Sequence, residues 1–294
     1  MSRVVKYDIL RVAACFSIVL LHVSASYWSV VDVQSREFLV MTVYNSLTRF
    51  AVPVFFMLSG LFLVTPEREN VAVGKRVLKL VALFYVWSAF YAFQGIAVDT
   101  LKGAFSMEVF RAAVERFIFG RIHMWFLQIL CGFYLVIPVA RQICAKKEIL
   151  RYYLILWIIF RFFIPTLTNA FGLDTFQARI DSLGLDILVG NFGYFLLGYY
   201  LNITDIGKKA RRCIYAMGIA ALLLTPFLTV QDCIKSGTYV EKWFSPGSLN
   251  ILIMTIAIFV CFRYGKAFEQ VKERIYGQSY PAIHFSCTCS TCLY

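Results

Sequence analysis

The stretch LRVAACFSIVLLHVSASYW, residues 10–28, decides the fold class of this chain because it is long and apolar enough to cross a lipid bilayer. It nevertheless carries Arg11 near one end and His22 past its middle. Charged and titratable side chains are costly in hydrocarbon, and they persist mostly where they face a protein interior or a hydrated cavity. The stretch therefore predicts a membrane helix whose polar residues have a function.

The composition of the whole chain agrees with this interpretation. Of its 294 residues, 60% are hydrophobic and 16% are charged, and the mean hydropathy is +0.70. Soluble domains carry about 25% charged residues, so we expect an all-α polytopic membrane bundle of about eight transmembrane helices. Because Asp8 and Arg11 flank the first apolar run, we do not expect it to be a cleaved signal peptide. The predicted spans lie near residues 9–28, 40–64, 77–98, 122–140, 149–165, 186–203, 212–230 and 247–263.

The Lys and Arg residues predict the orientation in the cell membrane. With eight spans, the side that carries both termini has 18 of them and the other side has nine. Short loops rich in Lys and Arg stay in the cytoplasm, so both termini are expected there. The net charge of +12 then follows from topology and contact with anionic membrane lipids, and no nucleic-acid partner is expected.

Arg11 and His22 share one face of the first predicted helix. They are eleven positions apart, which on a helix separates them by about 16 Å along the axis and leaves them within about 20° of each other around it. Asp8, one turn before Arg11, is placed for an ion pair with it. Taken singly, an arginine near a span end can reach lipid phosphates and a histidine can bond a neighbouring helix. Their shared face favours a functional role.

Five segments, taken in order, resemble the membrane-bound acyltransferase family 3. The first carries the family's mark, an Arg or Lys followed after ten residues by His, and the resemblance covers about residues 1–262. Two of the segments, taken alone, also fit small residues that let helices pack closely. The segments are YDILRVAACFSIVLLHVS (7–24), PVFFMLSGLFL (53–63), KRVLKL (75–80), HMWFLQILCGFYLVIP (123–138) and GNFGYFLLGYYL (190–201).

The resemblance implies an enzyme that takes an acyl group, commonly acetyl, from cytoplasmic acyl-coenzyme A and passes it to a hydroxyl of the cell envelope. The expected partners are acyl-CoA as donor substrate, an envelope carbohydrate or lipid-linked acceptor, and membrane lipids, with no permanently bound cofactor. His22 matches the family's histidine and is expected to act as the general base, since imidazole titrates near neutral pH. Two rival hypotheses are a transporter or flippase with a polar intramembrane pathway and an inactive, truncated remnant.

The donor is expected to be held by cations on the cytoplasmic side. A guanidinium grips phosphate with two hydrogen bonds, which suits Arg11 to the phosphates of coenzyme A. Arg76 and Lys79 stand where the family shows arginine-x-x-arginine before its third helix, with lysine replacing the second arginine. We assign both to donor binding, although the same charges also serve the membrane topology.

Arg49 and the pair His123 and Trp125 are the remaining candidate residues. Arg49 lies within the second predicted span, so a partner or a wet cavity is implied. Three roles are open to it: polarising the thioester carbonyl, holding the acceptor, or pairing with an outer carboxylate such as Asp186. His123 and Trp125 begin the fourth span, where they either line the acceptor mouth or serve as interfacial residues.

The C-terminal part departs from the family pattern. Family members usually have ten spans, whereas residues 264–294 form a short polar tail after a membrane domain at 1–263. We therefore expect a truncated or frame-altered chain that lacks the last two helices. Cys287, Cys289 and Cys292 cluster in the tail without a fourth spaced ligand, so no metal site is expected.

Overall fold

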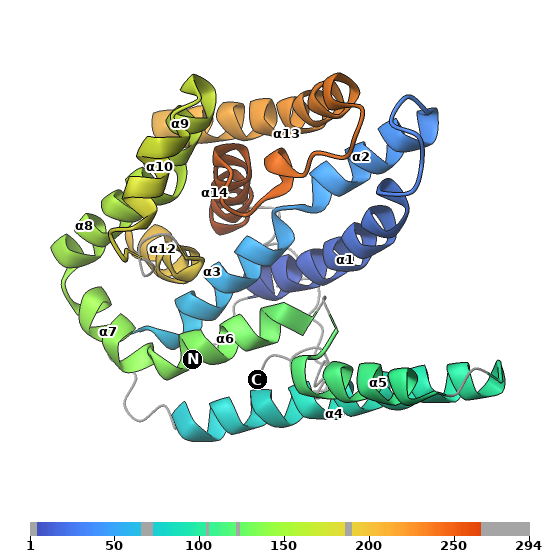
Figure 1. The fold of residues 1–294 in the computed structure, drawn as a ribbon. Coiled ribbons are helices and arrows are strands. Elements are labelled where there is room, and N and C mark those ends of the chain that lie inside the picture. The colour runs from blue at the N-terminus through green and yellow to red at the C-terminus, as the bar shows by residue number, and fades with distance from the viewer. Residues whose placement is uncertain (1–4, 66–72, 104–105, 122–123, 186–189, 266–294) are drawn as a thin grey trace, which may run out of the picture. The chain divides into compact units, whose positions relative to one another are not determined.

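In the computed structural model the described residues form helices joined by loops, with no strand among them (Figure 1). The structure describes residues 5–65, 73–103, 106–121, 124–185 and 190–265. The all-α fold class predicted from the sequence is therefore confirmed for these residues.

The chain divides into two compact units, Met1–Pro66 with Gln142–Tyr280 and Glu67–Arg141 with Pro281–Tyr294. The bent connection α7 (Ile137–Ala145) crosses from the second unit into the first. In the second unit the described helices are α4 (Val73–Leu101), α5 (Met107–Phe119) and α6 (Trp125–Leu135). In the first they are α1 (Val5–Trp28), α2 (Arg36–Thr48), α3 (Ala51–Leu63), α8 (Lys147–Ile158), η2 (Ile159–Phe163), α9 (Ile164–Phe171), α10 (Asp174–Asp181), α12 (Phe192–Ile203), α13 (Lys208–Ser236), η3 (Lys242–Phe244) and α14 (Leu249–Tyr264).

Six helical segments of the described residues are long and apolar enough to cross a membrane, and α6 with α7 makes a seventh if the bent pair is one span. The chain is therefore a multi-pass membrane protein. The predicted span at 186–203 contains α12, which has 12 residues, and its first residues, 186–189, lie outside the described part. The six segments are Val5–Trp28, Arg36–Leu63, Val73–Leu101, Lys147–Asn169, Lys208–Ser236 and Lys242–Tyr264.

Two prolines account for breaks within predicted spans. Pro53 has no N–H to give to the carbonyl of Arg49 four residues earlier, and α2 ends at Thr48 just before that point. Pro138 stands at the start of α7, where the pair α6–α7 bends by 61°. The first break places Arg49 at the joint between two helices of one span.

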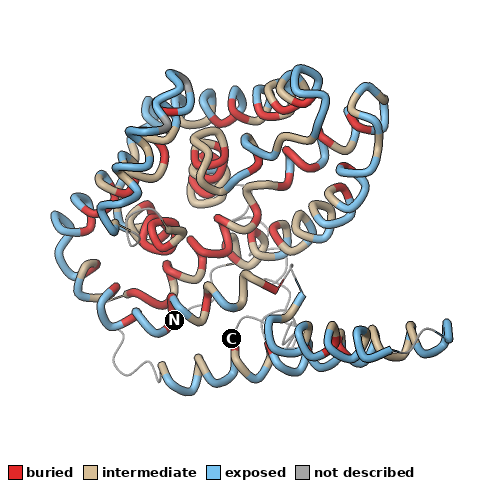
Figure 2. The backbone as a smooth tube through the Cα atoms, in the orientation of Figure 1, coloured by how far each residue is buried: buried red, intermediate tan, exposed pale blue. Residues whose placement is uncertain are grey.

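The core of the first unit is centred on α3, which packs against α1, α12 and α14. Figure 2 shows buried residues concentrated on α3, α12 and α14. Glycines allow the closest crossing: a Cβ on Gly198 would overlap the backbone carbonyl of Met57, and one on Gly60 would overlap that of Phe195. Without a strong hydrophobic drive between helices in lipid, such backbone contact is a main source of packing energy.

In the second unit α5 packs along α4. The Ser106 side chain accepts a hydrogen bond from the Val109 N–H at the start of α5, and Gly120 ends the helix with a positive φ of 73°. The sequence MEVFRAAVERFIF, residues 107–119, places its apolar residues at helical intervals, and the helix it indicates is present with those bounds.

Candidate functional site

Arg11 lies at the end of α1 where α3 also ends. Its guanidinium forms an ion pair with Asp8 at 2.8 Å, which confirms the contact expected from the three-residue spacing. The guanidinium carbon also lies 4.5 Å from the centre of the Phe62 ring at the end of α3. The carboxylate and the ring hold this cation beside α1 while leaving it partly exposed.

His22 is carried by the same unbroken helix, so its separation from Arg11 follows from helix geometry as expected, about 16 Å along the axis. The side chain of His22 is exposed, whereas Ser24, two residues on, is buried. The Ser26 hydroxyl donates to the backbone carbonyl of His22 at 2.7 Å. The imidazole therefore lies outside the buried stripe of α1.

Arg49 lies within electrostatic range of His22, although 27 positions separate them in the sequence. The guanidinium carbon of Arg49 is 4.4 Å from the centre of the Phe244 ring in η3, and Glu241 lies within electrostatic range on the same segment. The histidine on α1 and the arginine at the α2–α3 joint are thus within electrostatic range of each other.

The Arg49 guanidinium has a hydrogen-bond donor without an acceptor. Its Nε is buried and has no hydrogen-bond partner, and among the described residues Arg49 forms no ion pair. The partner suggested from the sequence, Asp186, lies outside the described residues. A buried N–H without a partner costs free energy, which a bound carbonyl or hydroxyl oxygen would recover.

Asn45 is a further buried polar residue, four positions before Arg49, that the sequence analysis did not single out. It lies one helical turn before Arg49 on α2, it is fully buried, and neither its Oδ1 nor its Nδ2 has a partner. The sequence could have indicated Asn45. It is a polar residue in the apolar run MTVYNSLTRFAVPVF, residues 41–55, and it lies four positions before the candidate residue Arg49. Asn45 and Arg49 together present unsatisfied donors and an acceptor inside the helix bundle.

The remaining candidate residues are not joined to this site by the structure. Arg76 and Lys79 lie near the start of α4, and Trp125 begins α6, all three in the second unit. His123 lies outside the described residues, as do Cys287, Cys289 and Cys292. Their roles stay predictions.

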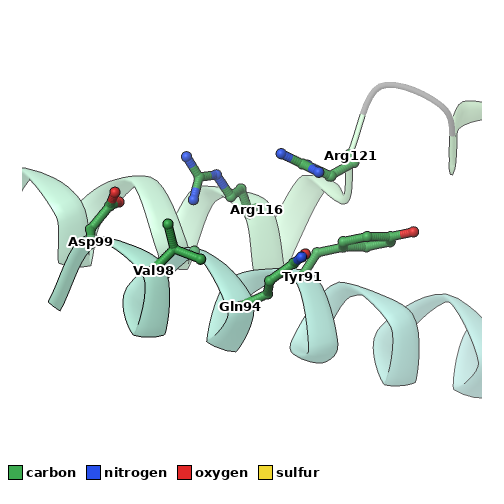
Figure 3. A pocket seen from close by; sticks show the side chains of 7 residues that line it. Tyr91, Gln94, Val98, Asp99, Arg116 and Arg121 are labelled. Atoms are coloured by element: carbon green, nitrogen blue, oxygen red, sulfur yellow. The ribbon is translucent and has the colours of Figure 1, made fainter. Parts of the chain in front are cut away.

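A pocket of about 240 Å³ lies between α4 and α5 within the second unit (Figure 3). Arg116 and Arg121 extend over α4 from one side, and Tyr91, Gln94 and Asp99 line the pocket from α4. The Arg121 guanidinium carbon is 5.3 Å from the centre of the Tyr91 ring. In the described part of the chain neither arginine forms an ion pair, so both guanidiniums are available to an anionic or hydroxylated ligand.

A larger cavity, of about 740 Å³, lies in the first unit between α9, α13 and the segment that leads from η3 into α14. It is lined by cations, amides and hydroxyls at one end and by the apolar face of α13 elsewhere. None of the residues expected to act in catalysis or to bind the donor lines it.

Among the described residues, no group of three or more His, Cys, Asp or Glu side chains is arranged to hold a metal ion. Comparison with known proteins gives one family: a model described as an acyltransferase domain matches residues 4–275. No curated protein and no solved structure gives a significant match.

Proposed function

The chain belongs to the acyltransferase 3 family, and from this premise we propose that the enzyme transfers an acyl group, commonly acetyl, from acyl-CoA to a hydroxyl of an envelope carbohydrate or glycolipid. The observation that carries the proposal is the proximity of His22 to Arg49 inside a membrane acyltransferase. One side chain is a base and the other is a permanent cation, and acyl transfer from a thioester needs both functions.

In the proposed reaction the acceptor hydroxyl attacks the thioester carbonyl carbon while the His22 imidazole takes its proton. The carbonyl oxygen becomes negatively charged as the new C–O bond forms, and the Arg49 guanidinium stabilises that charge. The tetrahedral intermediate then loses the thiolate as the C–S bond breaks, and His22 returns the proton to the sulfur. The products are the ester and free coenzyme A, so atoms and charges balance.

Arg11 supports the donor side of the proposal. It is a partly exposed cation on the half of α1 opposite to His22. We assign it to the phosphates of coenzyme A. In this proposal both chain termini, and this half of α1, lie on the cytoplasmic side of the membrane. Arg76 and Lys79 are assigned to the same donor. A distance of about 16 Å along α1 between phosphate and base suits an extended pantetheine arm.

The pocket between α4 and α5 supports the acceptor side. Planar polar side chains and an aromatic ring, as Arg116, Arg121, Gln94 and Tyr91 provide, suit recognition of sugar hydroxyls and acidic substituents. His123 and Trp125, on the following segment of the chain, are assigned to the same acceptor.

The proposal is tested with membranes that contain the full chain, labelled acetyl-CoA and the envelope fraction of the host. His22→Ala is expected to lower ester formation and coenzyme A release by about 100-fold or more, as loss of a general base does. Val23→Ala, at the neighbouring exposed position, is the matched control and keeps full activity. Unchanged transfer by His22→Ala at equal abundance in the membrane, or export of a solute without any new ester, overturns the proposal.

A further inference from the structure

The 740 Å³ cavity of the first unit is a groove with one polar end and one apolar wall. The apolar wall is one face of α13, on which lining residues recur every three or four positions from Met217 through Leu224 to Leu228. The helix rises by about 16 Å from Met217 to Leu228. The volume lies within the range of about 300 to 1,000 Å³ that is usual for ligand pockets.

The polar end carries two cations from different elements. Arg161 lies in η2, a π-helical turn inside the span Lys147–Asn169, and such turns are frequent at functional sites. Its guanidinium lies against Gly247, where a Cβ would come within 2.8 Å of the guanidinium carbon. The Lys242 ammonium stands 5.1 Å from the centre of the Trp243 ring at the same end.

Arg161 is available to a ligand. Its Nε is buried without a hydrogen-bond partner, and among the described residues the side chain forms no ion pair or hydrogen bond. Asn250 also carries a polar atom without a partner. Its two side-chain N–H groups donate hydrogen bonds to Thr225 Oγ1 at 2.8 Å and to the Trp243 carbonyl at 2.9 Å. The Asn250 Oδ1 is buried and has no partner, so it remains as an acceptor in the groove.

The polar end also stands at the edge of the membrane-spanning part. The span Lys208–Ser236 ends, and the span Lys242–Tyr264 begins, in the turn that carries Lys242 and Trp243. Tryptophan and lysine are typical of the level of the lipid headgroups. From this turn the groove extends along α13 toward the apolar interior of the membrane. A polar end followed by an apolar wall matches a lipid, which has a charged headgroup followed by an acyl chain.

We propose that this groove binds a membrane lipid with a phosphate-containing, hydroxylated headgroup. Arg161 and Lys242 receive the phosphate, the Asn250 Oδ1 accepts a hydrogen bond from a headgroup hydroxyl, and the Met217–Leu228 face of α13 covers an acyl chain. A zwitterionic headgroup adds a second cation next to Arg161 and Lys242 and is bound less well. The proposal concerns lipid binding, so it is independent of acyl transfer.

The test measures lipid bound to the full chain in detergent after mixing with equal amounts of phosphatidylglycerol and phosphatidylcholine, by native mass spectrometry. The wild-type protein is expected to retain phosphatidylglycerol in excess. Arg161→Gln is expected to lower its affinity by about 10-fold or more, because a charge-assisted hydrogen bond is removed. The matched control is Arg179→Gln on α10, which removes an exposed charge away from the groove and keeps the preference.

A second pair of variants tests the apolar wall. Leu224→Trp fills the groove and is expected to exclude the lipid, whereas Leu223→Trp, on an exposed neighbour that does not line the groove, leaves binding unchanged. Equal retention of both lipids, or equal behaviour of the two arginine variants, overturns the proposal. Displacement by millimolar inorganic phosphate alone indicates a site for a free anion and overturns it too. A change of oligomeric state in Leu224→Trp without a change in bound lipid shows that protein occupies the groove.

Discussion

The guanidinium carbon of Arg49 lies 4.4 Å from the centre of the Phe244 ring, so a cation at the joint of α2 and α3 rests on an aromatic side chain from η3. Phe244 is itself 1% exposed and packs in a cluster with Trp28 and Phe38. A buried ring beneath a cation both holds the guanidinium plane and offsets part of its desolvation. The contact therefore holds the Arg49 guanidinium over the Phe244 ring.

Phe244→Leu tests whether this ring positions Arg49. We expect acyl transfer to fall by about 10- to 30-fold, since a desolvated cation–π contact contributes about 2 kcal/mol and about 1.4 kcal/mol changes a rate tenfold. The measurement is the transfer rate per amount of protein in the membrane. Phe38→Leu is the matched control, because Phe38 is equally buried in the same cluster and also contacts Trp28, whereas the Arg49 guanidinium lies over the Phe244 ring. Equal losses in the two variants would show that packing alone is responsible.

Asn45→Leu separates function from stability. Because neither amide atom of Asn45 has a partner, an apolar side chain of similar size is expected to leave the free energy of unfolding unchanged or to raise it by about 1 kcal/mol. The transfer rate is expected to fall about 10-fold, since the amide can no longer bond substrate. Thermal unfolding in detergent and the transfer rate measure the two effects.

Ser46→Ala is the control for Asn45→Leu. The Ser46 hydroxyl already donates to the Thr42 carbonyl at 2.6 Å, so its removal is expected to cost about 1 kcal/mol of stability and to leave the transfer rate unchanged. A marked loss of stability in Asn45→Leu would mean that its amide has a structural partner, contrary to this expectation.

Gly198→Ala tests the crossing of α3 and α12. A methyl group there overlaps the carbonyl of Met57, and neither helix can yield without moving the backbone, so we expect destabilisation by about 2 kcal/mol or more. The midpoint of thermal unfolding is the measurement. Gly132→Ala in α6 is the comparison: it meets no atom within 4 Å and is expected to stabilise by about 0.5–1 kcal/mol. Similar midpoints for the two variants would rule out a close crossing.

Arg116→Gln tests the pocket between α4 and α5. If this pocket binds the acceptor, the KM for the envelope acceptor rises about 10-fold while the KM for acetyl-CoA stays constant, since a charge-assisted contact is lost only on the acceptor side. Steady-state kinetics with each substrate varied in turn gives both constants. Arg111→Gln, an exposed residue of the same helix outside the pocket, should change neither. A rise in the acetyl-CoA constant would place the donor at this pocket instead.

Several features followed from residues close together in the chain. The apolar runs predicted an all-α membrane protein, and the three-residue spacing of Asp8 and Arg11 predicted their ion pair, which is present. The helix at 107–119 was also readable from its periodicity. The ten-residue interval between Arg11 and His22, with the other segments, indicated the family that the match over residues 4–275 shows. Helical geometry is local, so the sequence alone determines which residues share a face.

The tertiary structure alone decided which faces meet. Three features depend on segments that are far apart in the chain. They are the contact of Arg49 with Phe244, the burial of Asn45 and the groove along α13. Their positions depend on how far each helix rotates and approaches its neighbours. The break at Pro53 and the backbone contact at Gly198 set the rotation and the distance of the helices. Helices in lipid associate through such close packing, and the periodicity of the sequence does not encode it.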